Sequence, residues 1–186
     1  SAYTNYPRVE TLLIESTYGA KEDIQPSRQE VEAAFIASVN SVLKDGGKVL
    51  IPIPAVGRAQ ELMMVIDKYM KSGELTEAPV FMEGMIQEAT SIHESFPEYL
   101  VRELKQKILE TDDNPFDSEY FTNIEHPNDR DEPLREGSPC IIIATSGMLE
   151  GGPVLDYFRN IAPNKQNKLL FVSYQVNGTL GRRVMD

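Results

Sequence analysis

The strongest constraint on the fold is a regular alternation along the chain between short apolar runs and longer stretches of helical periodicity. The apolar runs predict strands at 11–15, 48–53, 79–82, 139–144 and 168–174. Helical spacing of apolar residues predicts helices at 27–44, 58–71, 84–95, 98–110 and 153–161, with another helix beginning at 178. Because strands that are apolar on both faces alternate with helices, we expect an α/β fold. It is a three-layer Rossmann-like domain, a mainly parallel sheet with helices on both faces.

Local signals support several of these boundaries. Ser27 is followed three residues later by Glu30, a pattern typical of a capping box at a helix start. Pro52 removes a donor from its strand, so we expect it to mark the strand's end. Pro153 stands at the first position of a predicted helix, where a missing N–H costs nothing.

One acidic region, 111–138, interrupts the alternation. It bears prolines and lacks periodicity, so we expect a surface excursion with a short helix near 117–121. Residues 110–136 carry ten acidic and two basic side chains, out of a net charge of −11 for the chain. Because this charge would repel a nucleic acid, we expect the region to lie away from any phosphate-binding edge. The 186 residues otherwise fit a single domain, 1–186.

The composition excludes several classes of protein. One cysteine, Cys140, rules out an internal disulfide framework and favours a reducing, cytoplasmic location. No apolar run approaches the roughly 20 residues of a membrane helix, so we expect no membrane partner. The first residues do not resemble a signal peptide. His93 and His126 are the two histidines, and with one cysteine they cannot supply an imidazole–thiolate metal site. We therefore expect no metal ligands in this chain.

The turns after the strands carry the candidate chemistry, because ligands in open α/β sheets bind at the carboxyl ends of the strands. These turns, at 15–19, 54–58, 83–84, 145–152 and 175–179, are rich in Gly, Ser and Thr. Glycine lets backbone amides approach a ligand closely, and helix starts present free N–H groups to an anion. The edge therefore suits phosphate, and the candidate ligands are Arg58, Ser146, Gly147, Thr179 and Arg182. The alternative is that the glycines only shape tight turns.

Two charged residues leave alternatives open. Glu15 follows an apolar run and either caps amides of its own turn or orients a metal ligand or proton donor. Arg58 opens a helix at the positive end of its dipole, where a cation gains nothing. It therefore either pairs with Glu61 or binds a phosphate, for which a guanidinium is well shaped. The glycine-rich dinucleotide fingerprint, the P-loop and the nucleophile elbow are all absent from the sequence.

Four motifs in order give the sequence a family resemblance. They are Leu-Ile-Glu-Ser-Thr-Tyr-Gly at 13–19, the stretch 51–62 with Gly-Arg-Ala-Gln-Glu-Leu, Ala-Thr-Ser-Gly-Met with Gly-Gly in 144–152, and Gly-Thr-Leu-Gly at 178–181. Together they resemble the β-CASP domain of metallo-β-lactamase-type nucleases. The resemblance is greatest to the archaeal homologues of the nuclease subunit of the cleavage-and-polyadenylation specificity factor.

The resemblance implies a zinc-dependent ribonuclease in mRNA 3'-end processing or RNA decay, with two zinc ions in the parent enzyme. The family's metal ligands lie in a flanking metallo-β-lactamase domain, and its His-rich cluster is absent here. The resemblance carries over only Glu15, as a supporting acidic residue of the catalytic site. We therefore expect this chain to be a cap domain that binds single-stranded RNA in the parent, contacts the metallo-β-lactamase domain, and is inactive alone. The alternative is a stand-alone Rossmann-like module that binds a small phosphorylated ligand or a protein partner. The sequence leaves the oligomeric state open.

Overall fold

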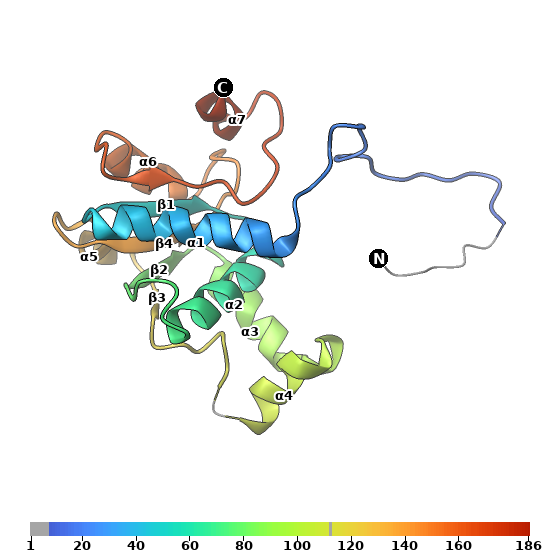
Figure 1. Cartoon of the computed structure of the whole chain (residues 1–186), viewed down its shortest axis with the longest axis horizontal. Helices are drawn as coiled ribbons and strands as arrows, with labels where there is room; N and C mark the ends of the chain where they lie inside the picture. The colour runs from blue at the N-terminus through green and yellow to red at the C-terminus, as the bar shows by residue number, and fades with distance from the viewer. Residues whose placement is uncertain (1–7, 112) are drawn as a thin grey trace.

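The computed structural model describes residues 8–111 and 113–186, and its centre is a five-stranded parallel sheet (Figure 1). The strands are β1 (Lys48–Pro52), β2 (Val80–Glu83), β3 (Phe121–Asn123), β4 (Cys140–Ala144) and β5 (Lys168–Leu169). Their order in the sheet is β3-β2-β4-β1-β5, and each adjacent pair is parallel. The predicted α/β class with a parallel sheet is confirmed.

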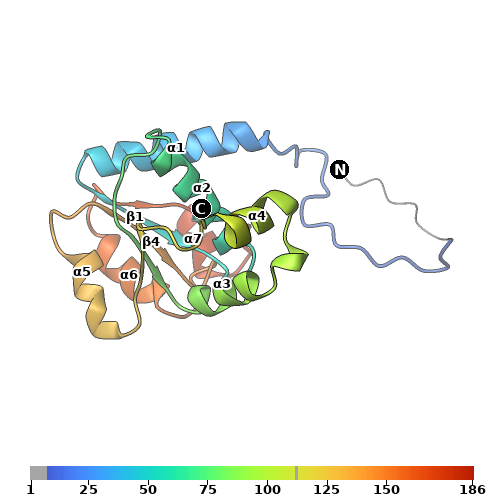
Figure 2. The same ribbon diagram turned by 90° about the horizontal axis from the view of Figure 1, so that it is seen from below.

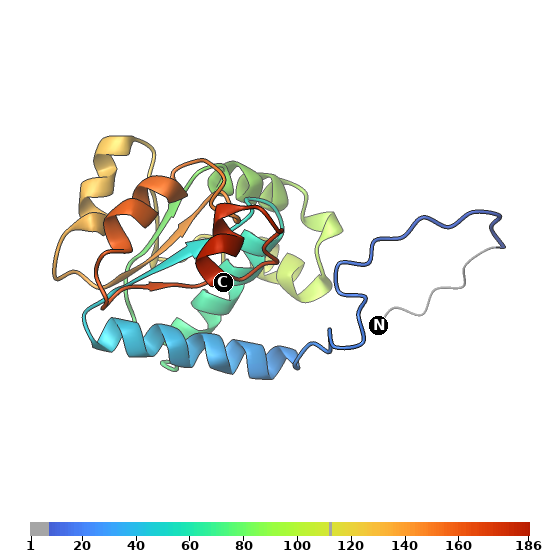
Figure 3. The ribbon, with the colours of Figure 1, turned by 90° about the horizontal axis from the view of Figure 1, so that it is seen from above.

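Helices cover both faces of this sheet. They are α1 (Arg28–Lys44), α2 (Arg58–Lys71), α3 (Ile86–Ser95), α4 (Arg102–Glu110), α5 (Asp131–Leu134), α6 (Val154–Ile161) and α7 (Leu180–Met185), with short 3-10 helices η1 (Pro97–Tyr99) and η2 (Pro127–Arg130). Figures 2 and 3 show three layers, with α1 and α2 on one face of the sheet and α5 and α6 on the other. No helix among the described residues is long and apolar enough to cross a membrane.

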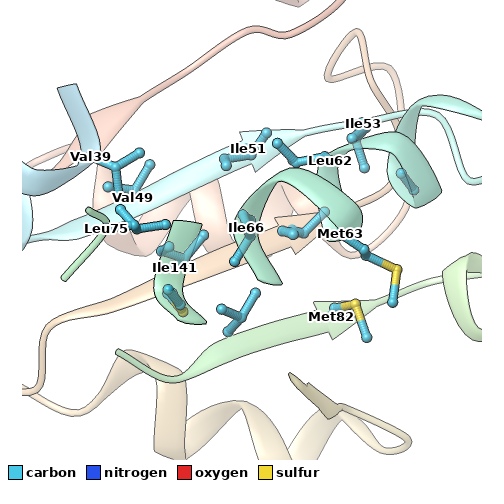
Figure 4. Close-up of a cluster of buried hydrophobic side chains, with 14 of the residues drawn as sticks. Val39, Val49, Ile51, Ile53, Leu62, Met63, Ile66, Leu75, Met82 and Ile141 are labelled. Carbon is cyan, nitrogen blue, oxygen red and sulfur yellow. The ribbon is translucent and has the colours of Figure 1, made fainter. Parts of the chain in front are cut away.

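The core consists of two apolar clusters, one on each face. Strand residues such as Ile51 and Ile141 meet Val39 of α1 and Ile66 of α2 in the first cluster (Figure 4). Leu50 and its neighbours on the opposite face pack against α6 in the second. Every residue of β1 and β4 is buried, as expected for strands covered on both faces.

The predicted helix and strand ends have clear local causes. The Ser27 side chain accepts from the Glu30 amide, and the Glu30 carboxylate accepts from the Ser27 amide, so the capping box is confirmed. Pro52 is the last residue of β1, and the Ile53 amide then donates to Ala144. The predicted strands near β2 and β4 and the predicted helix at the end of the chain are also confirmed.

Three expectations about elements are wrong. Residues 11–15 form no strand, and the side chains of this run are solvent-exposed, to 98% at Leu13. Residues 117–121 form turns that lead into β3 instead of a short helix. The strand predicted at 168–174 ends at Leu169, although the Leu170 amide still donates to Leu50. The acidic region thus supplies the edge strand β3, which pairs with β2 from Phe121 onward.

Candidate phosphate-binding edge

The strands end together at one edge of the sheet, because Pro52 and Glu83 both pair with Ala144. The turns that follow these three strand ends therefore lie side by side. They include Ser146, Gly147 and the start of α2, where Arg58 is the first helical residue. This agrees with the expectation for the turns after β1, β2 and β4, whereas the turn at 15–19 follows no strand among the described residues.

The turn after β4 has the hydrogen-bonding capacity to bind an anion. Ser146 Oγ accepts from the Glu150 amide at 3.1 Å, which leaves the hydroxyl hydrogen free to donate. Within the described residues, the amides of Gly147 and Met148 donate to no group of the protein. One hydroxyl hydrogen and two successive amides therefore have no acceptor within the described residues; Gly147 is buried, and Ser146 and Met148 are partly exposed. Successive amides in a turn form anion-binding concavities.

Neighbouring turns hold this turn in place. A Cβ at Gly147 would lie 2.8 Å from Pro54 Cδ, so only glycine permits this close approach. The buried Gln175 side chain donates to the Gly147 carbonyl oxygen at 2.9 Å. The Gly181 amide donates to Met148 at 2.9 Å. The turn is thus fixed between the segments that follow β1 and β5.

Thr179 and Arg182 are engaged within the chain. Thr179 caps α7, where its hydroxyl accepts from the Arg182 amide and donates to the Val176 carbonyl at 2.7 Å. The next amide, of Leu180, donates to the Glu150 carboxylate at 2.5 Å. The Arg182 guanidinium pairs with Asp186 at 3.1 Å. The first amides of this helix therefore already have acceptors, and the phosphate role of Thr179 and Arg182 stays a prediction.

Arg58 forms the ion pair that was one of its two interpretations. Its guanidinium lies 2.6 Å from the Glu61 carboxylate, and both side chains are substantially exposed, to 49% and 40%. The pair lies at the amino end of α2, beside the turn that packs on Gly147. An exposed pair of this kind leaves the guanidinium accessible to an incoming phosphate.

Glu15 lies outside the sheet, on the exposed segment before α1. Its carboxylate accepts from the Thr17 amide at 2.9 Å, and this hydrogen bond lowers the pKa of Glu15. The capping interpretation of Glu15 is therefore observed. The Tyr18 ring meets the Tyr174 ring edge-on with centroids 5.8 Å apart, which brings this turn next to the segment after β5.

Sequence reasoning missed a buried cluster of charged side chains at the same edge. Glu83, the last residue of β2, accepts from Arg130 of η2 and from the Tyr157 hydroxyl at 2.6 Å. The carboxylate raises the pKa of Arg130, and burial raises the pKa of Tyr157. The acidic region thus touches this edge through Arg130, so the expectation that it lies away is wrong there. The one available signal was a carboxylate that ends a buried strand, which requires a counter-charge.

The chain's possible metal ligands do not form a centre. Among residues 8–111 and 113–186, no group of three or more His, Cys, Asp or Glu side chains is placed to hold a metal ion. His93 Nδ1 donates to the Ala89 carbonyl oxygen at 2.7 Å within α3, whereas His126 lies at the start of η2. The His, Cys, Asp and Glu side chains that the structure describes are therefore too dispersed to form a zinc site.

Comparison with known proteins identifies the family. A family model for the Beta-Casp domain matches residues 59–184. The chain is 81% identical over its whole length to a protein of Cenarchaeum symbiosum named transcription termination factor FttA, of which it covers 29%. It is 49% identical to the protein of that name from Methanocaldococcus jannaschii and 50% identical to that of Pyrococcus abyssi, covering 29% and 28% of their lengths. The resemblance to the archaeal homologues of the cleavage-and-polyadenylation nuclease is confirmed. The chain belongs to the Beta-Casp domain family.

Proposed function

We propose that this chain is the cap domain of a longer ribonuclease and that its carboxyl edge binds the phosphates of single-stranded RNA. The observation that supports the proposal is the turn after β4, where the Ser146 hydroxyl and two successive amides have no acceptor within the described residues. Donors fixed before the substrate arrives stabilise developing phosphate charge without reorganisation. Arg58 adds a charged donor from the neighbouring helix start.

The lengths and names of the relatives support a larger parent. The chain spans less than a third of each relative named above, and these relatives are named transcription termination factors. We infer that the parent acts on transcripts in the cytoplasm and shapes their 3' ends by phosphodiester hydrolysis. A metallo-β-lactamase domain of the same protein would hold two zinc ions, since no group of ligands among residues 8–111 and 113–186 is placed to hold a metal ion. The alternative of a stand-alone module is not favoured, because every relative named above is far longer.

The test uses the full-length parent and a labelled single-stranded RNA. Ser146→Ala removes one donor of the turn and should weaken RNA binding and cleavage about tenfold, which is about 1.4 kcal/mol. The matched control is Ser41→Ala, at an exposed position near the carboxyl end of α1. This variant should bind and cleave RNA as the wild type does. Equal affinities for both variants would contradict the phosphate role of the turn.

A second measurement addresses the division of labour within the parent. The 186-residue chain alone should bind no zinc in stoichiometric amount and should leave RNA intact. Zinc content by atomic absorption and RNA integrity on a gel report these outcomes. One tightly bound zinc ion per chain, lost on substitution of His93 or His126, would contradict the proposal.

A further inference from the structure

A cluster of Glu83, Arg130, Tyr157 and the half-exposed Asp156 joins three elements that are distant in sequence. Arg130 Nε lies 2.9 Å and 3.0 Å from the two Glu83 carboxylate oxygens, and Nη2 lies 2.5 Å from one of them. Its Nη1 donates to Asp156 of α6 at 2.8 Å. The side chains of Glu83 and Arg130 are exposed to only 9% and 17%. One guanidinium therefore links β2, η2 and α6.

A buried ion pair is poorly explained as a source of stability alone. Removing two charges from water costs about as much as their attraction returns, and apolar side chains of similar size often stabilise a core equally well. Its advantage is directional, because an arginine fork fixes both the distance and the angle of a carboxylate. The cluster is therefore suited to fixing the end of β2 in one position.

The end of β2 in turn supports the candidate phosphate-binding turn. The Glu83 carbonyl accepts from the Thr145 amide at 3.3 Å. At Gly84, with φ of +97°, a Cβ would lie only 2.0 Å from Thr145 Oγ1, so the two residues are in close contact. Thr145 then accepts from the Val154 amide at 3.0 Å and is followed directly by Ser146. A displacement of Glu83 would therefore reach the turn through Thr145.

We propose that Arg130 and Glu83 are positioning residues, which hold the turn of Ser146 and Gly147 in the geometry that binds a phosphate. This inference rests on the proposed function of that turn. It gives the acidic region a role, since η2 brings a single arginine to the edge. Arg130 also neutralises the Glu83 carboxylate, which would otherwise repel an anion beside the turn.

The experiment compares three variants of the full-length protein. The double variant Glu83→Leu with Arg130→Met replaces the ion pair with apolar side chains of similar size. Tyr157→Phe removes one hydrogen bond from Glu83 and changes no charge. The matched control is Arg159→Met, which removes the exposed arginine that also pairs with Asp156 but does not touch Glu83. Each is measured by amide hydrogen exchange and by affinity for single-stranded RNA.

The double variant should lose protection at least tenfold at the amides of Thr145, Leu149 and Val154, while the β1 and β4 amides keep theirs. Its RNA affinity should fall at least fivefold, and Tyr157→Phe should show the same changes to a smaller extent. Arg159→Met should show neither. If the double variant also loses protection in β1 and β4, Tyr157→Phe decides between a local and a general effect. Wild-type protection of the turn in Tyr157→Phe would then overturn the inference.

The two proposals fail in different ways. Unchanged exchange at the turn in the double variant overturns the positioning role, whatever the RNA affinity. A loosened turn with wild-type RNA affinity also overturns it, provided that Ser146→Ala weakens binding. If Ser146→Ala itself binds RNA as the wild type does, the proposed function of the turn has failed instead.

Discussion

Arg58 pairs with Glu61 on the surface. This arginine has two possible roles, one in stability through the ion pair and one in binding an RNA phosphate. An exposed ion pair contributes only about 0–1 kcal/mol to stability, so the fold gains little from it. We expect Arg58→Ala in the full-length parent to change the melting temperature by at most a few degrees. It should lower kcat/KM for RNA cleavage at least tenfold, about 1.4 kcal/mol of transition-state stabilisation.

Glu61→Gln is the control, because it breaks the same ion pair and keeps the guanidinium, while also removing the longer 3.7 Å pair of Glu61 with Arg28. This variant should melt like Arg58→Ala and cleave RNA at the wild-type rate. Thermal denaturation and steady-state kinetics on both variants separate the two roles. Normal cleavage by Arg58→Ala, together with a melting temperature several degrees lower, would assign the arginine to the scaffold.

Cys140 is a buried thiol within β4. Burial raises its pKa to about 11, although the Lys48 ammonium, 3.9 Å from Sγ, partly opposes this effect. Since only the thiolate is nucleophilic, Cys140 should react very slowly with a disulfide reagent at pH 8. In denaturant, one thiol per 186-residue chain should react at once. Rapid reaction of the folded chain would show that β4 opens readily.

The capping box of α1 gives a prediction for a single helix. Ser27→Ala removes the hydroxyl that accepts from the Glu30 amide and donates to the Glu30 carboxylate. This change should lower the free energy of unfolding by about 1 kcal/mol. For a domain of this size, that loss corresponds to a melting temperature lower by roughly 2–4 °C. Ser41→Ala, on the exposed face of the same helix, should not lower it. Equal melting temperatures for the two variants would contradict a stabilising cap.

The sequence predicts those elements whose own residues are apolar enough to indicate burial. β1 and β4 are continuous apolar runs between turn residues, and both form where expected. β3 escapes prediction because Phe121–Asn123 is short, partly polar and at the edge of the sheet. Residues 11–15 have the same apolar pattern as β1. Such a pattern indicates that the run tends to be buried, but it does not identify the part of the protein that buries it.

The candidate site likewise contains residues that the sequence predicts and residues that it does not. Ser146 and Gly147 are predictable because strand ends in a parallel sheet share an edge, whatever the details of packing. The contact between Arg130 and Glu83 joins positions 47 residues apart and has no local sequence signal. Its existence follows only from the path of the acidic region after β3. Long-range pairs of charges therefore need the structure, whereas turn chemistry does not.

The whole molecule exposes an unusual apolar surface before α1. Leu12, Leu13 and Ile14 are exposed to 69%, 98% and 73%, and within the described part of the chain no hydrogen bond ties 8–26 to the sheet or its helices. The edge-on contact between Tyr18 and Tyr174 holds this segment against the segment after β5 and stabilises it by about 0.5–1.5 kcal/mol. We propose that the rest of a longer parent covers these side chains, because each relative named above extends beyond the matched part by more than twice this chain's length.

This gives a prediction that compares two lengths of the same protein. Replacing Leu12, Leu13 and Ile14 together with serine should leave the melting temperature of the 186-residue chain nearly unchanged, because these side chains are mostly exposed there. In the full-length parent, the same substitutions should be strongly destabilising, since burying each such side chain is worth about 1.5–3 kcal/mol. Ile143→Ser, in the fully buried β4, should destabilise both lengths and serves as the control. Thermal denaturation of the four variants gives the comparison. Wild-type stability of the full-length triple variant would show that this run stays exposed in the parent and that another surface joins the cap domain to the rest of the protein.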